Sequence, residues 1–239
     1  MDGTSGRSRG RSSARGLQQR LESLKAAGVT SLPKRGGRHG GRLHVAAAAT
    51  PKDHLLAVLR EEVSKCERCK PLAKSRTHTV FGAGSATARL CFLGEAPGAD
   101  EDATGEPFVG RAGQLLTKII EACTLTREQV YILNVLKCRP PENRTPLPEE
   151  TANCRAYFER QLEIIAPEFV CCLGTTAAQA LLQTDETIGK LRKRWFSWRS
   201  AQVICTYHPS YLLRNPAAKR DVWDDMKLLM TGLGVTLSP

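Results

Sequence analysis

The segment RLCFLGEAPG, residues 89–98, joins a short apolar run to a turn rich in glycine and proline. An apolar run of this length that ends at a turn is typical of a buried β-strand. Three other segments have the same form: VYILNVLK at residues 130–137, FVCCLG at 169–174 and QVICTYH at 202–208. The sequence therefore predicts four buried strands.

Helical patterns separate these runs. The clearest lies at residues 111–123, where apolar residues recur every three or four positions. Further helices are predicted at residues 148–166, 175–183 and 217–231. Strands that alternate with helices form a mostly parallel sheet with helices on both faces. We therefore expect an α/β fold with three α/β/α layers and a four-stranded, mainly parallel central sheet.

Charge and composition divide the chain into two parts. Residues 1–50 hold ten Arg or Lys and two acidic residues, in a chain of net charge +11. This part is rich in Gly, Ser and Ala and has no sustained apolar period, so we expect a disordered basic extension. It fits a basic arm that follows phosphates, an organelle transit peptide or a solubilising tail. Residues 51–239 are long enough for one folded domain with its own core.

The location of the protein is predicted from what the sequence lacks. No apolar run approaches the ~20 residues that cross a bilayer, and no secretory signal is visible. We expect a soluble, monomeric protein of the cytoplasm or nucleoid, or of an organelle if the basic extension is a transit peptide. Nine cysteines without an export signal indicate metal ligands or buried thiols rather than disulfides.

Four cysteines have the spacing of a metal site. Cys66 and Cys69 form a CxxC motif, Cys138 lies in KCRPP, and Cys154 lies on a predicted helix. Four thiolates suit either tetrahedral zinc or an iron–sulfur cluster, and the spacing does not choose between them. Free cysteine is often buried in cores, and this is the expected place of the other five: Cys91, Cys123, Cys171, Cys172 and Cys205.

Three unusual motifs follow predicted strands. GEAPG follows the first strand, NVLKCRPP continues from the second, and YHPSYLLRNP from the fourth. Ligands bind beyond the carboxyl ends of the strands in open α/β sheets, so we expect these motifs to meet at one edge. The first belongs to GEAPGADEDATGEPFVGRAG, residues 94–113, which holds five carboxylates in a basic protein. We expect Asp100, Glu101 and Asp102 to form a solvated acidic turn before a helix.

In order and spacing, CERC, GEAPGADED, GEPFVGRAG, VYILNVLKCRPPENR, TYHPSYLLRNP and KRDVWDDMK resemble the iron–sulfur uracil-DNA glycosylases of family 4. The resemblance covers about residues 55–230 and leaves out residues 1–50. It implies a DNA repair enzyme with a uracil-DNA glycosylase fold. Such an enzyme flips uracil out of single- or double-stranded DNA and hydrolyses its N-glycosidic bond, leaving an abasic site. It also implies a [4Fe–4S] cluster, of structural role, on Cys66, Cys69, Cys138 and Cys154.

The same resemblance implies roles for residues of the base pocket. Phe108 would stack on uracil, and the carboxamide of Asn134 would recognise its donor and acceptor. His208 would face the O2 atom and stabilise the anion that forms as the base leaves. The turn after the first strand would add contacts from Glu95, Ala96 and Pro97. Glu95 would also stabilise the positively charged sugar.

The group that activates water is left open. In the family 1 enzymes the matching loop reads GQDPY, and its water-activating Asp falls where this chain has Ala96. Another arrangement must serve here, and the sequence offers Glu95 only as a candidate base.

Basic residues on the same sheet edge are candidates for DNA contacts, since phosphates are bound mainly by Arg and Lys. These are Lys137, Arg139, Arg144 and Arg214. Leu212 and Leu213 resemble the wedge that fills the gap left by a flipped base, although core packing would also explain two leucines.

Two other kinds of protein compete with a glycosylase. A covalent or non-catalytic uracil-DNA binder of family X would carry GEQPG and an inserted loop with KRRIH, whereas this chain has GEAPG and no such insertion. An interaction module that carries a cluster is the other alternative. No lysine is placed as a Schiff-base nucleophile, so we expect base removal without strand cleavage.

Overall fold

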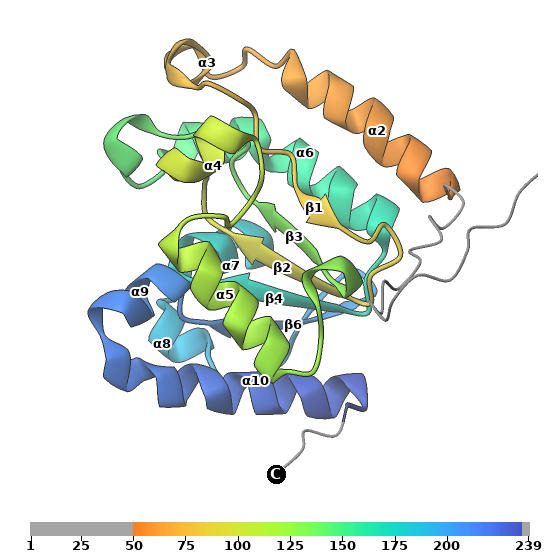
Figure 1. Cartoon of the computed structure of the whole chain (residues 1–239), viewed down its shortest axis with the longest axis vertical. Coiled ribbons are helices and arrows are strands. Elements are labelled where there is room, and N and C mark those ends of the chain that lie inside the picture. The colour runs from red at the N-terminus through yellow and green to blue at the C-terminus, as the bar shows by residue number, and fades with distance from the viewer. Residues whose placement is uncertain (1–49, 236–239) are drawn as a thin grey trace, which may run out of the picture. The chain divides into compact units, whose positions relative to one another are not determined.

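The computed structural model describes residues 50–235, so the predicted basic extension lies outside it except for Thr50. A β-sheet with the strand order β1-β3-β2-β4-β6-β5 runs through this part of the chain (Figure 1). Its strands are β1 Ala83–Gly84, β2 Leu90–Gly94, β3 Tyr131–Asn134, β4 Phe169–Leu173, β5 Phe196–Trp198 and β6 Ala201–Thr206.

The four predicted strands form the parallel centre of the sheet. Strands β3, β2, β4 and β6 pair in parallel, whereas β1 and β5 add antiparallel edges. The described residues thus form six strands, and the predicted count of four was wrong. The edge strands have two and three residues, too few to show an apolar run in the sequence.

Both faces of the central strands are buried. Leu90 and Phe92 of β2 point to one face, and Cys91 and Leu93 point to the other. This follows from the two-residue period of a strand, and burial on both faces explains why the run is apolar throughout. The alternation produces two separate cores, one on each side of the sheet.

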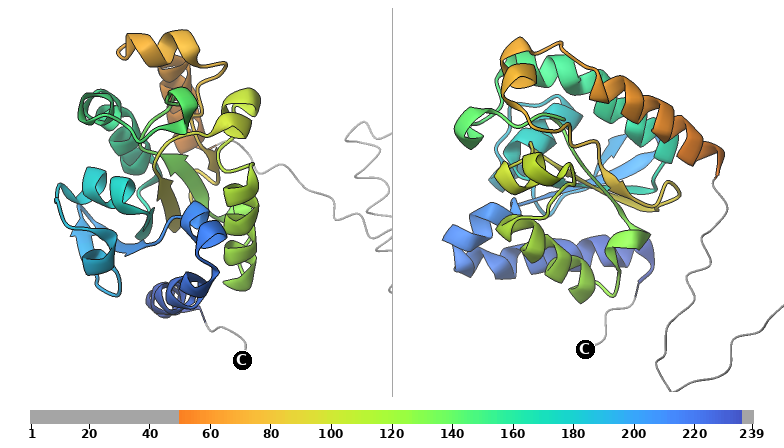
Figure 2. Two further views of the ribbon diagram at one scale, coloured as in Figure 1. Left: turned by 90° about the vertical axis from the view of Figure 1, so that its left-hand side faces the viewer. Right: turned by 45° about the horizontal axis from the view of Figure 1, so that its top comes forward.

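Different helices cover the two faces. Leu59 of α2 (Pro51–Ser64) and Phe158 of α6 (Pro148–Ile165) belong to the core that contains Cys91. Leu116 of α5 (Arg111–Ala122) and Met226 of α10 (Lys219–Leu233) belong to the core that contains Phe92. Helices α2 and α6 lie side by side above the sheet in Figure 1, and α10 lies below it (Figures 1 and 2). The long helices are α2 Pro51–Ser64, α5 Arg111–Ala122, α6 Pro148–Ile165, α7 Thr175–Leu182 and α10 Lys219–Leu233.

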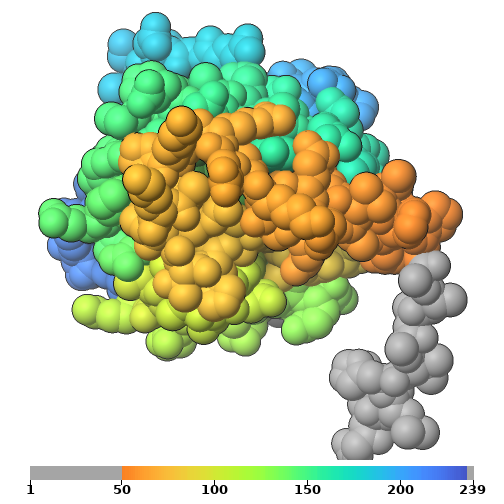
Figure 3. Space-filling model, turned by 90° about the horizontal axis from the view of Figure 1, so that it is seen from above, coloured from red at the N-terminus to blue at the C-terminus, as the bar shows by residue number. Residues whose placement is uncertain are grey.

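Short helices connect these elements. Helix α3 follows α2 along the chain, and both lie on the face of the domain that Figure 3 shows, where they are orange. The short elements are α3 Lys70–Ser75, α4 Ala99–Thr104, α8 Ile188–Leu191, α9 Pro209–Arg214 and the 3₁₀ turns η1 Arg127–Gln129, η2 Pro141–Asn143 and η3 Pro216–Ala218. Between residues 50 and 235, no helix combines the length and apolarity needed to cross a membrane.

Helix α2 begins at a well-defined helix cap. The hydroxyl of Thr50 accepts a hydrogen bond from the backbone N–H of Asp53, and the Asp53 carboxylate accepts one from the backbone N–H of Thr50. Pro51 occupies the first helical position, where its missing N–H costs nothing.

Candidate active site

A cavity of about 750 Å³ opens at the carboxyl ends of the parallel strands. The turns after β2, β3 and β6 all line it, as predicted from the three motifs. The turn after β4 also contributes, through Gly174 and Thr175, and the sequence analysis assigned it no role. The lining residues used below are Glu95, Pro97, Gly98, Glu101, Phe108, Asn134, Arg144, Tyr207, His208, Ser210, Tyr211 and Arg214.

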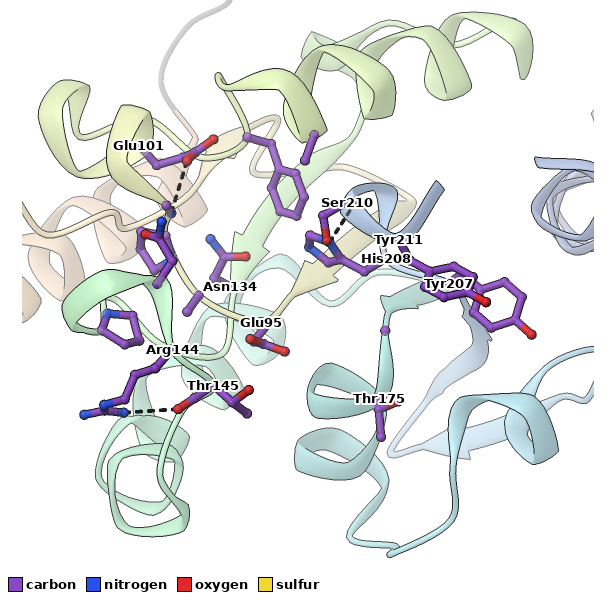
Figure 4. A pocket seen from close by; sticks show the side chains of 18 of the residues that line it. Glu95, Glu101, Asn134, Arg144, Thr145, Thr175, Tyr207, His208, Ser210 and Tyr211 are labelled. Atoms are coloured by element: carbon purple, nitrogen blue, oxygen red, sulfur yellow. Dashed lines mark hydrogen bonds between the residues drawn. The ribbon is translucent and has the colours of Figure 1, made fainter. Parts of the chain in front are cut away.

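Phe108, Asn134 and His208 all line this cavity. Asn134 and His208 lie near one another in Figure 4. The ring centroids of Phe108 and His208 are 5.6 Å apart, and the ring planes are inclined by 35°. A Cβ atom on Gly94 would overlap both the Oδ1 atom of Asn134 and the ring of Phe108. The three side chains therefore surround one slot, and the prediction that they lie together is confirmed.

Asn134 has a buried acceptor without a partner. Its side chain ends strand β3 and is only 2 % exposed. The Oδ1 atom is buried and accepts no hydrogen bond from any residue between 50 and 235. A buried polar atom without a partner costs stability, so a ligand with a donor at this position would be bound favourably.

His208 is held in one orientation and one protonation state. It precedes α9, and its Nδ1 atom accepts a hydrogen bond from the backbone N–H of Ser210 at 3.2 Å. The neutral ring therefore carries its proton on Nε2. Burial, helped by the charge of Arg214, lowers the pKa of His208 to about 4. At neutral pH the side chain is an uncharged donor.

Glu95 is fixed by a residue that the sequence analysis missed. The hydroxyl of Thr176, in the first turn of α7, donates to Glu95 Oε2 at 2.6 Å. This contact orients the carboxylate, which lines the cavity beside Asn134 (Figure 4). A threonine that follows an apolar strand is also an ordinary helix start, so no signal in the sequence distinguished it.

Most of the acidic turn at residues 100–102 faces the protein. Glu101 accepts hydrogen bonds from the backbone N–H groups of Gly98, Val109 and Gly110 at 2.9–3.1 Å. Asp102 is buried and accepts from two backbone N–H groups of the segment before β1. The expectation of a solvated turn was correct only for Asp100, which is exposed. The other two carboxylates hold the loop together.

The backbone of Phe108 has an unusual conformation. Its φ angle is +54°, in the left-handed region that few non-glycine residues adopt. On one side Glu101 binds the two N–H groups that follow Phe108, and on the other Arg127 donates to the carbonyls of Pro107 and Phe108 at 2.8 and 3.2 Å. Gly113 completes the arrangement, because a Cβ there would overlap the Phe108 carbonyl. Strained backbone of this kind persists where several contacts determine it.

The structure divides the six predicted DNA-binding residues into two that are buried in the core and four that are not. Lys137 is 1 % exposed, and its ammonium donates to the carbonyls of Phe81 and Asn134 at 3.2 and 2.7 Å. Burial lowers its pKa to about 7. Leu212 is 1 % exposed and packs in the core with α5 and α10. The predictions that Lys137 contacts phosphates and that Leu212 is a wedge were therefore wrong.

The other four positions remain available to DNA. Leu213 is 39 % exposed, and Arg214 lines the cavity. Arg144 also lines it and forms a two-point ion pair with Glu150 at 2.6 and 2.9 Å. Arg139 donates to the side chain of Asn143. These four stay predictions.

The four candidate metal ligands lie near one another. Asn153 donates to Cys69 Sγ at 3.5 Å, and Arg76 donates to Cys138 Sγ at 3.2 Å. Burial, together with the neighbouring thiols of Cys138 and Cys69, raises the pKa of Cys154 to about 11. No three Cys, His, Asp or Glu side chains of the described chain form a group that could hold a single metal ion. The five other cysteines are buried, as predicted.

Comparisons with known proteins agree with this geometry. The family model of the Uracil DNA glycosylase superfamily matches residues 81–227. The chain is 45% identical over 180 residues to the type-4 uracil-DNA glycosylase of Thermotoga maritima, covering 74% of this chain and 93% of that protein. It is 44% identical over 174 residues to the type-4 enzyme of Archaeoglobus fulgidus, covering 70% and 87%. A type-5 uracil-DNA glycosylase of Pyrobaculum aerophilum is 30% identical over 179 residues, covering 62% and 79%.

Proposed function

Because the chain belongs to the type-4 enzymes of the uracil-DNA glycosylase superfamily, we propose that it removes uracil from DNA and leaves an abasic site. The observation that carries this proposal is the unpartnered Oδ1 atom of Asn134 in a slot between Phe108 and His208. A uracil that has left the DNA stack presents the N3–H donor that this oxygen lacks.

Three side chains would bind the base. Phe108 provides the stacking face. The Asn134 carboxamide accepts from N3–H and donates to O4, whereas cytosine presents the opposite pattern and leaves both groups unpaired. His208 donates from Nε2 to O2. Ala96 and Pro97 border the same slot from the turn after β2.

The chemistry follows from where charge develops. Breakage of the bond between C1′ and N1 leaves its electron pair on the base. A water oxygen then bonds to C1′ and loses its extra proton to solvent water. The Nε2–H of His208 stabilises the uracil anion without transferring a proton, an effect worth ~3–4 kcal/mol by comparison with oxyanion holes. The Glu95 carboxylate, held by Thr176, would stabilise the positive sugar.

We propose that Cys66, Cys69, Cys138 and Cys154 hold a [4Fe–4S] cluster. Tetrahedral zinc needs all four sulfurs ~2.3 Å from one point, and the described thiols form no such group. In a cluster each thiolate binds a different iron, so neighbouring thiols that do not converge fit better. When bound, the cluster would cross-link the segment after α2 to the loop after β3 and to α6. The residues above account for base excision without redox chemistry.

The remaining parts of the proposal concern the DNA contacts, the oligomeric state, the location and the layers of the fold. Arg139, Arg144, Arg214 and Leu213 would contact the DNA, single- or double-stranded, and the protein would act as a monomer in the cytoplasm or nucleoid. The two cores on opposite faces of the sheet support the three-layer α/β/α arrangement as the finer description of the fold.

Incubation of the purified protein with uracil-containing single-stranded DNA tests the function. Abasic product with turnover supports a glycosylase, a stable protein–DNA adduct indicates a covalent binder, and unchanged DNA indicates an interaction module. The visible absorbance of anaerobically purified protein tests the cofactor separately, because iron–sulfur clusters are coloured and zinc is not. A colourless protein with bound zinc would overturn the cluster assignment.

The lowered pKa of His208 predicts a flat pH profile. Above a pKa of about 4 the imidazole is neutral, so the titration of His208 should change the single-turnover rate by less than about 2-fold between about pH 5.5 and about pH 8. A rate measurement across that range tests this, and an inflection near the ordinary value of 6.5 would contradict it. In the unfolded chain His208 is protonated at a higher pH than in the folded protein. The free energy of unfolding should therefore decrease as the pH falls from 6.5 to about 4.

Arg127 is predicted to act on catalysis through Phe108. Arg127→Gln removes the donors to the carbonyls of Pro107 and Phe108, and kcat/KM should fall by about 10-fold as the ring loses its fixed position. The exposed ion-pair residue Arg160 is a matched control, and Arg160→Gln should have no effect. In a Phe108→Ala background the Arg127 change should cost nothing more. An undiminished cost there would show that Arg127 acts elsewhere.

A further inference from the structure

The cavity extends well beyond the base slot. Its volume of about 750 Å³ suits a ligand much larger than one pyrimidine. Asn134 lies on one side of His208, and Tyr207 and Tyr211 lie side by side on the other (Figure 4). Neither tyrosine has a role in the base contacts described above, although both line the cavity.

The two tyrosines belong to a column of stacked side chains. The ring centroids of Tyr207 and Tyr211 are 4.8 Å apart, with the planes inclined by 31°. The guanidinium of Arg192 lies 4.4 Å from the centroid of Tyr207. Arg192 in turn donates to Asp225 at 2.7 Å. The column therefore runs from a buried ion pair to the cavity.

The inner end of the column is rigid and its outer end is open. Asp225 is completely buried and also accepts from the hydroxyl of Thr206, the last residue of β6, at 2.6 Å. Arg192 makes a further hydrogen bond to the carbonyl of Asp221 at 2.5 Å. In contrast, Tyr211 is 38 % exposed. An aromatic ring with this support can receive a ligand with little loss of conformational entropy.

We propose that Tyr211 stacks on the base next to the flipped uracil in the same DNA strand. Aromatic rings beside a basic groove are the usual platform for unpaired bases, because every base has a stacking face. The base slot and Tyr211 share one cavity, so one strand can occupy both. Arg214, which lines the cavity three residues after Tyr211, is available to the phosphate between the two nucleotides. This inference rests on the proposed uracil excision and adds a second base subsite to it.

The test combines a protein change with a substrate change. Steady-state kcat/KM for excision is measured on a short single-stranded oligonucleotide and on two versions with an abasic analogue on the 5′ or the 3′ side of uracil. Tyr211→Ala should lower kcat/KM on the complete oligonucleotide by about 10-fold, mainly through KM, since one base–aromatic stack is lost. One abasic substrate should cause the same loss for the unchanged protein, and on that substrate Tyr211→Ala should have no further effect.

Two variants serve as controls. Tyr211→Phe keeps the ring and should retain full activity. Trp223 is an aromatic residue of similar exposure, 36 %, that does not line the cavity, so Trp223→Ala should leave the rate unchanged. Equal losses for Tyr211→Ala on all three substrates, or no loss on any, would overturn the proposal.

The proposed function and the second subsite fail in different ways. If the unchanged protein excises no uracil, the proposed function fails. In that case the affinities of the unchanged protein and of Tyr211→Ala for the same three oligonucleotides, measured by fluorescence anisotropy, still test whether Tyr211 stacks on a neighbouring base. Normal excision without coupling between Tyr211 and a neighbouring base removes only the second subsite.

Discussion

Replacing Asn134 by aspartate is expected to lower kcat/KM for uracil excision by about three orders of magnitude. The carboxylate keeps an acceptor for N3–H but loses the donor to O4, so two acceptors face each other in a buried site. It also places a negative charge beside a base that becomes an anion as it leaves. Both effects act at a side chain that is only 2 % exposed, where solvent provides little screening.

A second asparagine in the cavity shows how much of the effect comes from the added charge and how much from the lost recognition of the base. Asn143 lines the same cavity but is exposed, and Asn143→Asp should reduce kcat/KM by no more than about 3-fold. Single-turnover rates on single-stranded DNA measure both variants, and thermal unfolding verifies that each is folded. If Asn134→Asp retains more than a tenth of the activity, Asn134 does not recognise the base.

Gly94→Ala should reduce excision by about two to four orders of magnitude, because small displacements of reacting groups have large effects on rate. The added methyl group would overlap Asn134 Oδ1 and the ring of Phe108, whose Cζ atom is 2.5 Å from the Cβ position. Gly94 lies at the end of a central strand that pairs with β3, so the backbone cannot move away easily. The two side chains that bind the base must therefore separate. The misfit should also destabilise the fold by about 1–3 kcal/mol.

A glycine on α8 provides the comparison. Gly189 also borders the cavity, but a Cβ there would have no atom within 4 Å. Gly189→Ala should change the rate by less than about 2-fold, since a methyl group in open space disturbs nothing. Excision rates and melting temperatures of the two variants test the difference. Equal behaviour of the two would mean that contact at Gly94 does not shape the base slot.

The four central strands could be predicted because they are buried on both faces and read as continuous apolar runs. Their parallel order then placed three motifs at one sheet edge, two of which contain Asn134 and His208, whereas the place of Phe108 beside them was implied by the family resemblance. The edge strands are too short for such a pattern. Strand β1, at Ala83–Gly84, contains no large apolar side chain at all.

Lys137 shows why the sequence could not separate DNA contacts from core residues. After β3 the chain continues along β2, since Val135 N–H donates to Gly94 O and Leu136 N–H donates to Glu95 O. Lys137 is thereby kept inside, where two carbonyls receive its ammonium. The sequence does not show this, because residues that leave a sheet after a strand and residues that continue beside the next strand can have the same apolar pattern.

Leu212 and Leu213 show a similar limit. Neighbours on a helix point about 100° apart, and on this helix Leu212 faces the core while Leu213 is 39 % exposed. The sequence does not fix which of the two faces the core, because helix α9 has six residues and no apolar period of its own.

Thr176 and Arg127 were missed for another reason. Each acts on a residue far away in the sequence, Thr176 on Glu95 and Arg127 on Phe108. Contacts of this kind depend on how the elements pack, and a pattern along one chain does not contain them.

The inward-facing carboxylates of Glu101 and Asp102 have a consequence for an approaching polyanion. DNA phosphates that come to this rim meet two acids whose oxygens accept hydrogen bonds from backbone amides, and the amide dipoles partly offset the negative potential of the two carboxylates. A protein of net charge +11 can thus keep an acid-rich turn beside the cavity at the carboxyl ends of the strands. Neutralising Glu101 by mutation would loosen the rim more than it would help DNA to bind.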